Sequence, residues 1–462
     1  MWKRKYSNKL KIVSILITVC FMFLIGAALS KGGVVAMNHD SYVAKTKTTK
    51  KLNDDKVQYK TVLGNVYDAK GAPILESSET IDKSKYEYNK SYSHLLGSVS
   101  LSNDAYLSNN WETLTDTSAP DAVDNKGYSV MLTINNDLQQ FAYEQTEGTR
   151  ASVVVLKRHS GEIVAMTSTY QQDFDLGSDI TDEEIAAYNN CGESVWVPEY
   201  LNSYPPGSCQ KIFSSAVAYE TGNGDYTIDD TGEISYGGDK ICNFEKKAYG
   251  SGLDMEKAFS VSANTYFASL FNKTDVGDIR RLSDALKLND SIETDFGKIN
   301  NNFSFGGYSD FDVGLLAIGQ KNELSSVGMA MMTQGVIDNE IYQPHVTKAT
   351  CYSDKNGELK TKETTKENLL TSGMLKDGTS EQVRQLMENT AHSEGYGLSD
   401  NILGAKTGTA EIEIDGTYTD RASMVAYDED YIVVVSKIES SMGISNKDLV
   451  EKIFKKLDDV SQ

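Results

Sequence analysis

The chain has 462 residues, with 45 Lys and Arg against 66 Asp and Glu, and a formal net charge of −21. This acidic balance argues against a nucleic-acid binder, because such proteins need a basic face that displaces counterions from phosphates. The content of 36 Gly and 6 Pro excludes collagen and most low-complexity classes. We therefore expect a globular protein with one large domain and a smaller part.

The first apolar segment predicts a membrane anchor. Residues 12–29 are apolar or small except for Ser14 and Thr18, and at about 1.5 Å per residue they just cross a bilayer core. Residues 1–11 carry five basic and no acidic side chains, which predicts a cytoplasmic tail and a chain that is otherwise extracellular. A cleaved signal peptide is the alternative, but the run is longer than the apolar part of most such peptides. We favour a single-pass anchor in the cell membrane.

The composition of the following residues indicates three further parts. Residues 30–55 are polar and rich in Lys and Thr, which is typical of a stalk. Residues 56–145 mix short strand patterns with Ser, Asn, Asp and Tyr and predict a small pedestal domain. Residues 146–462 form the large domain.

Strand patterns occur at both ends of the large domain. Residues 151–156 and 162–168 flank a turn, and residues 424–427 and 431–437 flank another. Helical patterns fill the middle, and Ser445 is a plausible N-cap for a last helix. This order predicts an α+β domain whose sheet is assembled from the two ends of the domain.

The segment from Tyr204 to Phe213 contains the most informative motif. Pro-Pro-Gly ends the preceding structure and an apolar run follows, so Ser208 falls in the first turn of a buried helix. Lys211 lies three residues later, on the same face. A Lys in an apolar site loses proton affinity and can take the proton of a serine hydroxyl. Alone, this Ser-x-x-Lys pattern is more often a capping Ser beside a solvated Lys.

Two further clusters strengthen the prediction of an acyl-transfer site. Ser262-Ala263-Asn264 has the form Ser-x-Asn, and Lys406-Thr407-Gly408 is followed by Thr409. The ordered set Ser-x-x-Lys, Ser-x-Asn, Lys-Thr-Gly is found in penicillin-binding proteins and serine β-lactamases. A phosphate loop is excluded at Lys406 because residue 405 is Ala rather than Gly.

With these motifs in this order, the chain resembles the class B penicillin-binding proteins, the membrane-anchored D,D-transpeptidases of bacterial cell-wall synthesis and cell shape. The likeness starts near Gly64 and reaches the C-terminal helix. It implies a penicillin-binding transpeptidase domain, with an antiparallel sheet flanked by helices plus an all-helical subdomain. It also implies cross-linking of peptidoglycan stem peptides, penicillin binding, and a polytopic glycan polymerase as partner.

The resemblance also implies a role for each matching residue. Ser208 would be the nucleophile, Lys211 its base, and Ser262 the proton relay to the departing amine. Asn264 would position the donor peptide. Substrate would also be held by a second group of residues, namely Lys406, Thr407, Gly408 and Thr409. The backbone N–H groups of Ser208 and Thr409 would form the oxyanion hole.

Some residues depart from the family pattern. Cys209 and Gln210 replace a pair that is usually less polar; Cys209 is a possible rival nucleophile, and buried Gln210 needs a hydrogen-bond partner. Lys321 stands where a Gly is usual, and residues 421–427 lack the usual His-Ala-Trp-Phe signature. These departures keep open a catalytically weak scaffold, and a D,D-carboxypeptidase or β-lactamase is the other alternative. The scattered His and Cys residues predict no metal, and no cofactor is expected.

Overall fold

In a computed structural model of the protein, the described residues are 62–77, 89–97, 105–119, 126–170, 197–303, 305, 309–414, 416–439 and 441–461. They belong to one compact unit, Thr61–Gln462. The predicted tail, anchor and stalk lie outside the described residues. Among the described helices, none combines the length and the apolar character that a membrane crossing requires.

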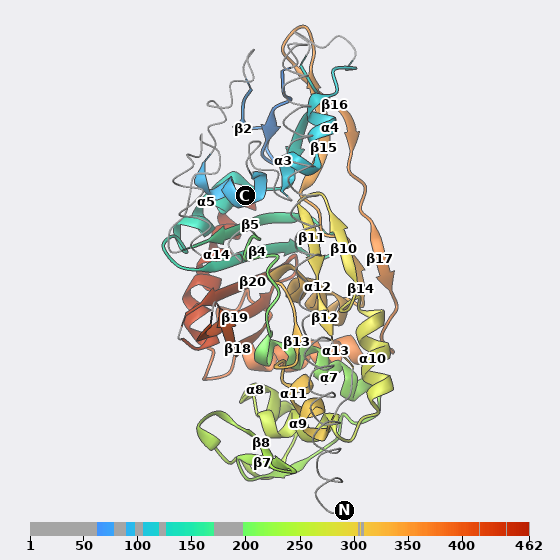
Figure 1. Cartoon of the computed structure of the whole chain (residues 1–462), viewed down its shortest axis with the longest axis vertical. Coiled ribbons are helices and arrows are strands. Elements are labelled where there is room, and N and C mark those ends of the chain that lie inside the picture. Colours follow the sequence, from blue (N-terminus) through green and yellow to red (C-terminus); the bar gives the residue numbers. More distant parts are fainter. Residues whose placement is uncertain are drawn as a thin grey trace, which may run out of the picture. The chain divides into compact units, whose positions relative to one another are not determined.

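A five-stranded antiparallel sheet in the order β18-β19-β20-β4-β5 forms the centre of this unit (Figure 1). Its strands are β4 (Ala151–Lys157), β5 (Ile163–Thr169), β18 (Gly404–Ile414), β19 (Thr417–Tyr427) and β20 (Tyr431–Ile438). The two predicted strand pairs are therefore confirmed, and the sheet does join the two ends of the domain. Strand β18 lies at an edge of the sheet, and none of the described strands pairs with its other side.

Alternation along the strands sends side chains into two separate cores. Val153 and Val155 face the core behind the sheet, which contains α5 (Asn136–Glu144) and α14 (Lys447–Ser461). Val154 faces the other core, which contains side chains of three helices, α7 (Lys211–Glu220), α12 (Ser326–Ile337) and α13 (Thr379–Ala391). The sheet is thus the middle layer between two layers of helices (Figure 1).

The last helix is confirmed, but its predicted N-cap is wrong. Helix α14 buries the predicted apolar face, namely Leu449, Val450, Ile453, Phe454 and Leu457. Ser445 lies inside a 3₁₀ turn, η6 (Gly443–Asn446), that precedes the helix. Its hydroxyl lies 3.2 Å from the hydroxyl of Ser441, so it serves the turn rather than α14.

The predicted all-helical subdomain also contains strands, which corrects that prediction. Its helices are α8 (Met255–Ser260), α9 (Asn264–Phe271), α10 (Val276–Ala285) and α11 (Asp310–Ala317). Between and beside them lie two-stranded ribbons, formed by β6 (Ile228–Asp230) with β9 (Gly250–Leu253), β7 (Glu233–Tyr236) with β8 (Asp239–Cys242), β10 (Ser291–Thr294) with β11 (Gly297–Asn300), and β12 (Asn302–Phe303) with β13 (Asn322–Glu323). Gly237 and Gly238 connect β7 to β8, and such a Gly-Gly pair favours a tight hairpin.

A second five-stranded sheet, in the order β16-β15-β3-β1-β2, contains the strands of the predicted pedestal. Its strands are β1 (Val66–Tyr67), β2 (Pro73–Leu75), β3 (Ser129–Leu132), β15 (Thr347–Ser353) and β16 (Leu359–Thr364), and the short helices α2 (Ser93–Leu96), α3 (Tyr106–Asn109) and α4 (Trp111–Thr115) belong to the same part of the chain. Because β15 and β16 come from residues 347–364, the two predicted domains share a sheet. Strand β17 (Leu369–Ser372) then pairs with β14 (Glu340–Tyr342).

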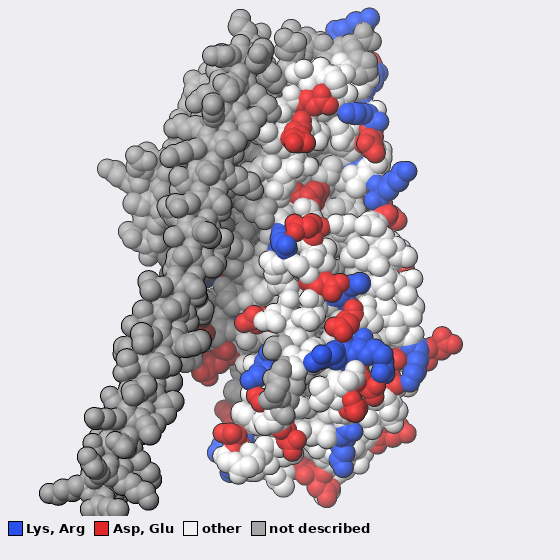
Figure 2. Space-filling model, turned by 45° about the vertical axis from the view of Figure 1, so that its right-hand side comes forward, with Lys and Arg blue, Asp and Glu red and all other residues white. Residues whose placement is uncertain are grey.

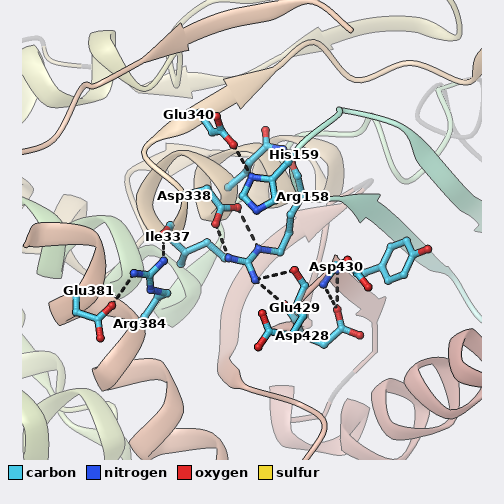
Figure 3. Close-up of polar contacts among 12 residues, drawn as sticks. Arg158, His159, Ile337, Asp338, Glu340, Glu381, Arg384, Asp428, Glu429 and Asp430 are labelled. Carbon is cyan, nitrogen blue, oxygen red and sulfur yellow. Dashed lines mark hydrogen bonds and ion pairs between the residues drawn. The ribbon is translucent and has the colours of Figure 1, made fainter.

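A buried ion pair fastens α12 to the turns at one end of the central sheet (Figure 3). Arg158 in the β4–β5 turn binds the carboxylate of Asp338, which caps the C-terminus of α12. Its guanidinium also donates to the main-chain carbonyls of Asp428 and Glu429 in the β19–β20 turn.

The exposed charges are of both signs: Lys and Arg side chains lie among Asp and Glu side chains over the face shown in Figure 2.

Candidate active site

The turn that carries Ser208 is built around Gly207. The chain leaves Pro205-Pro206 into a 3₁₀ turn, η4 (Gly207–Gln210), which continues into α7 as predicted. Gly207 has a φ of 54°, and a Cβ at this position would lie 2.5 Å from the carbonyl oxygen of Thr409. Only glycine therefore fits there, and its absent side chain lets the turn pack against β18.

Lys211 begins α7 directly below Ser208 and has no exposed surface. Its Nζ lies 2.9 Å from Ser208 Oγ and 3.1 Å from Ser262 Oγ. It also donates to Ser262 O and Asn264 Oδ1, each at 2.8 Å. Burial, and then the charge of Lys406, hold the pKa of Lys211 well below its ordinary value.

A neutral Lys211 can make these contacts and still accept a proton. A neutral amine has two protons and one lone pair, and the carbonyl of Ser262 and the amide oxygen of Asn264 can only accept protons. In that state these two acceptors use both N–H groups of Lys211, and its lone pair can accept the proton of either nearby hydroxyl, Ser208 or Ser262. Ser208 Oγ lies at hydrogen-bond distance to supply that proton.

Ser262 occupies a backbone conformation that L-residues seldom adopt. Its φ is 58°, which places it in the left-handed region between α8 and α9. This bend brings both its carbonyl and its hydroxyl to Lys211 and starts α9 at Asn264. Such local strain is tolerated where the surrounding contacts enforce it, and it is often found at functional sites.

A buried carboxylate that we did not predict supports this bend. Asp230 at the end of β6 accepts from the hydroxyl of Thr265 at 2.6 Å and from the side-chain amide of Asn243 at 3.0 Å. Asn243 in turn accepts from the backbone N–H of Thr265, and Asn264 donates to the carbonyl of Cys242. The two ribbons, β6 with β9 and β7 with β8, thus hold the first residues of α9. A sequence gives little signal of this, because the partners are up to 35 residues apart.

The third motif lies on β18, opposite Ser262. Lys406 is fully buried, and its Nζ donates to Ser262 Oγ at 3.1 Å and to Thr407 O at 2.9 Å. The predicted convergence is therefore observed: Ser262 Oγ lies between Lys211 and Lys406. Among the described residues, neither Lys forms an ion pair with a carboxylate.

The free edge of β18 presents backbone groups beside Ser208. The N–H of Thr407 donates away from β19, to the hydroxyl of Tyr396. Backbone directions alternate along a strand, so Thr409, two residues on, presents its own N–H to the same edge. Gly408, which we expected to help hold the substrate, instead permits close packing of the Ser208 turn, because a Cβ there would lie 2.5 Å from Pro206 O.

The two unusual residues after Ser208 are both fully buried. Cys209 is fully buried, donates to Lys406 O, and has a pKa raised by burial to about 11. A thiol of this kind is a poor nucleophile, so the rival role of Cys209 is not supported. Gln210 is also fully buried, and neither polar atom of its side chain has a hydrogen-bond partner within the described part of the chain.

Arg421 explains one departure from the family pattern. It is buried on β19 and donates to the carbonyls of Tyr204 at 3.3 Å and Leu324 at 2.8 Å, and to Ser326 Oγ at 3.2 Å. Tyr204 leads into the Ser208 turn, so Arg421 ties that turn to the sheet. Burial lowers the pKa of Arg421. The sequence showed the departure but not this contact.

Metal and disulfide sites are absent from the described residues. In that part of the chain, no three His, Cys, Asp or Glu side chains are grouped so that they could hold a metal. The described cysteines Cys209, Cys242 and Cys351 are free thiols.

Comparisons with known proteins find curated relatives over part of the chain. Among curated relatives, peptidoglycan D,D-transpeptidase MrdA of Haemophilus influenzae is 32% identical over 148 residues, which are 30% of this chain and 22% of that protein. MrdA of Acinetobacter baumannii is 27% identical over 164 residues, which are 34% of this chain and 24% of that protein. The matches thus span about a quarter of the length of these relatives.

Solved structures share the fold over most of the chain. The D,D-transpeptidase domain of a peptidoglycan glycosyltransferase from Eggerthella lenta has a TM-score of 0.73 and 20% identity, and the alignment covers 87% of this chain and 99% of that one. The penicillin G acyl-enzyme complex of penicillin-binding protein A from M. tuberculosis has a TM-score of 0.71 and 20% identity, over 83% and 94% of the two chains. The profile of the penicillin-binding protein transpeptidase domain matches residues 151–457. The chain therefore belongs to the family of penicillin-binding protein transpeptidase domains.

Proposed function

We propose that this protein is a peptidoglycan D,D-transpeptidase that works through an acyl ester on Ser208. The observation that carries the proposal is the position of the buried Lys211, whose Nζ lies 2.9 Å from Ser208 Oγ and 3.1 Å from Ser262 Oγ. Membership of the transpeptidase family, and the name of the MrdA relatives, support it.

Acylation follows from the arrangement of the three motifs. Lys211 takes the proton of Ser208, and Ser208 Oγ attacks the carbonyl carbon between the two terminal D-alanines of a stem peptide. The N–H groups of Ser208 and Thr409 stabilise the oxyanion. The C–N bond then breaks, and the departing D-alanine receives its proton through Ser262.

Transfer to the acceptor reverses the proton path. An amine of a neighbouring stem peptide attacks the ester carbonyl, the C–O bond to Ser208 breaks, and the proton of the amine returns to Ser208 Oγ through Lys211. Asn264, Lys406, Thr407 and Thr409 hold the donor peptide, and its backbone adds to the free edge of β18. A β-lactam acylates Ser208 in the same way, but its amine leaving group stays attached.

The location and partners belong to the same proposal. Residues 12–29 anchor the chain in the cell membrane with the transpeptidase domain, 146–462, outside. Residues 56–145 form a pedestal between the stalk and that domain. A polytopic glycan polymerase in the same membrane supplies the strands to be cross-linked. The apolar run, its basic flank and the class B resemblance support this arrangement.

Labelling with a fluorescent penicillin tests the proposal. We expect a stable adduct of one label per wild-type chain, with its mass on the peptide that carries Ser208, and no adduct in Ser208→Ala. Ser203→Ala, in the same segment, is the matched control and should label like wild type, as should Cys209→Ala. An adduct that persists in Ser208→Ala, or no adduct in wild type, would contradict the proposal. Rapid turnover of the penicillin would indicate a β-lactamase.

A further inference from the structure

Tyr396 reaches the free edge of β18 from behind the sheet. It lies in the loop between α13 and β18, and its ring is buried in the core that contains α14, with 8% of the residue exposed. Its hydroxyl accepts from the backbone N–H of Thr407 at 2.9 Å and lies 2.6 Å from Thr407 Oγ1. The phenol therefore contacts both polar groups of one residue of the Lys-Thr-Gly motif.

The proton count allows Tyr396 to donate the second hydrogen bond. The phenol oxygen already accepts from the N–H of Thr407, and it has one proton to donate. Within the described residues, Thr407 Oγ1 is the acceptor at hydrogen-bond distance for that proton. If Tyr396 donates to Thr407 Oγ1, the hydroxyl proton of Thr407 is released to point elsewhere.

We propose that Tyr396 is a positioning residue that turns the Thr407 hydroxyl toward the terminal carboxylate of the donor peptide, or toward the equivalent carboxylate of a β-lactam. The inference rests on the proposed function. Thr407 is half-buried on the free edge of β18 and Thr409 beside it is exposed, so an extended peptide can reach both.

The charge nearby favours an anion at this position. Lys406 Nζ lies 2.9 Å from the carbonyl of Thr407 and forms no ion pair among the described residues. A hydroxyl that donates to a carboxylate next to such an ammonium forms one of the stronger hydrogen bonds. If Thr407 donated its proton to Tyr396, it could not donate to that carboxylate.

Tyr396→Phe tests the proposal because it removes one oxygen and keeps the buried ring. We expect the second-order rate of acylation by penicillin G to fall about tenfold, as for the loss of a hydrogen bond to a charged group. Acylation by penicillin G methyl ester, which lacks the carboxylate charge, should change less than about twofold. Tyr418→Phe, on the exposed β18–β19 hairpin, is the matched control and should leave both rates unchanged.

A double-mutant cycle separates positioning from a purely structural effect. Thr407→Val should lower the penicillin rate at least as much as Tyr396→Phe, and the double variant should be no slower than Thr407→Val alone. Thr407→Ser, which keeps the hydroxyl, should remain sensitive to Tyr396→Phe. Equal losses for penicillin and its ester, or additive losses in the cycle, would overturn the inference. Failure of wild type to acylate Ser208 would instead overturn the proposed function.

Discussion

Two buried basic side chains, Lys211 and Arg158, have opposite surroundings. Lys211 is held by the hydroxyls of Ser208 and Ser262, a carbonyl and the amide of Asn264, and by no carboxylate among the described residues. Arg158, at the end of the sheet shown in Figure 3, is held by two carbonyls and the carboxylate of Asp338.

The presence or absence of an anion decides what each cation can do. Burial lowers the pKa of both groups, but for Arg158 the hydrogen bond and charge of Asp338 outweigh burial, and the net pKa is raised. For Lys211, burial and Lys406 act in the same direction, and the pKa falls. The charged Arg158 fastens three turns together, whereas Lys211 is left able to accept a proton.

The largest expected effect comes from making the charge at position 211 permanent. Lys211→Arg introduces a guanidinium that stays protonated at all working pH values, so Ser208 loses its base. We expect the acylation rate by fluorescent penicillin to fall at least about 10³-fold, or about 4 kcal/mol. Thermal unfolding checks that the variant is folded. A folded variant that acylates within tenfold of wild type would show that Lys211 is not the base.

Removing the carboxylate that binds Arg158 should lower the stability of the fold but not the rate of acylation. Asp338→Ala leaves the buried Arg158 without its anion, and we expect the free energy of unfolding to fall by about 3–5 kcal/mol. Urea unfolding measures this loss. The folded fraction should still acylate at the wild-type rate per active site. A loss under 1 kcal/mol would mean that water replaces the carboxylate.

A carboxylate beside Lys211 would make its surroundings resemble those of Arg158. Asn264→Asp puts an anion where an amide oxygen now accepts from Lys211, which should raise the pKa of Lys211. The neutral fraction at pH 7 then falls, and we expect acylation to slow about 10- to 100-fold.

The pH dependence of the acylation rate tests the explanation given for Asn264→Asp. Because deprotonation of Lys211 restores the base, the loss should shrink as the pH rises. Asn264→Ala, which removes the acceptor without adding charge, is the control and should not move the profile to higher pH. A loss in Asn264→Asp that is the same at every pH would refute the electrostatic explanation.

The smallest expected effect is a gain in stability when Lys211 is replaced by Met. The lowered pKa of Lys211 means that the unfolded chain binds more protons than the folded one between that pKa and the ordinary value near 10.5. Wild type should therefore gain stability as the pH rises through this window and lose it as the pH falls. Lys211→Met lacks this cost, and we expect it to be more stable by about 1–3 kcal/mol at pH 7.

Unfolding in urea at several pH values checks this prediction. The advantage of Lys211→Met over wild type should be largest near neutral pH and should shrink toward pH 10. An advantage that stays constant across this range would mean that packing, and not the proton equilibrium of Lys211, causes it.

Local patterns in the sequence determined much of the fold. The strand pairs at both ends of the domain and the apolar face of α14 follow from spacing alone. The β6–β9 ribbons were missed because short strands around Gly-Gly and Asp turns have little periodicity. The sharing of a sheet between the two predicted domains was also missed, since pairing of β15 with β3 joins residues more than 200 apart.

The sequence by itself determined which residues carry the chemistry, because each motif is short and its order along the chain is distinctive. Ser208, Lys211, Ser262, Asn264 and Lys406 could be named without coordinates. Only the tertiary structure decided that the pKa of Lys211 is lowered, and only it revealed the supporting contacts from Asp230, Tyr396 and Arg421. Burial and hydrogen-bond partners arise when distant segments pack together, and no local pattern encodes them.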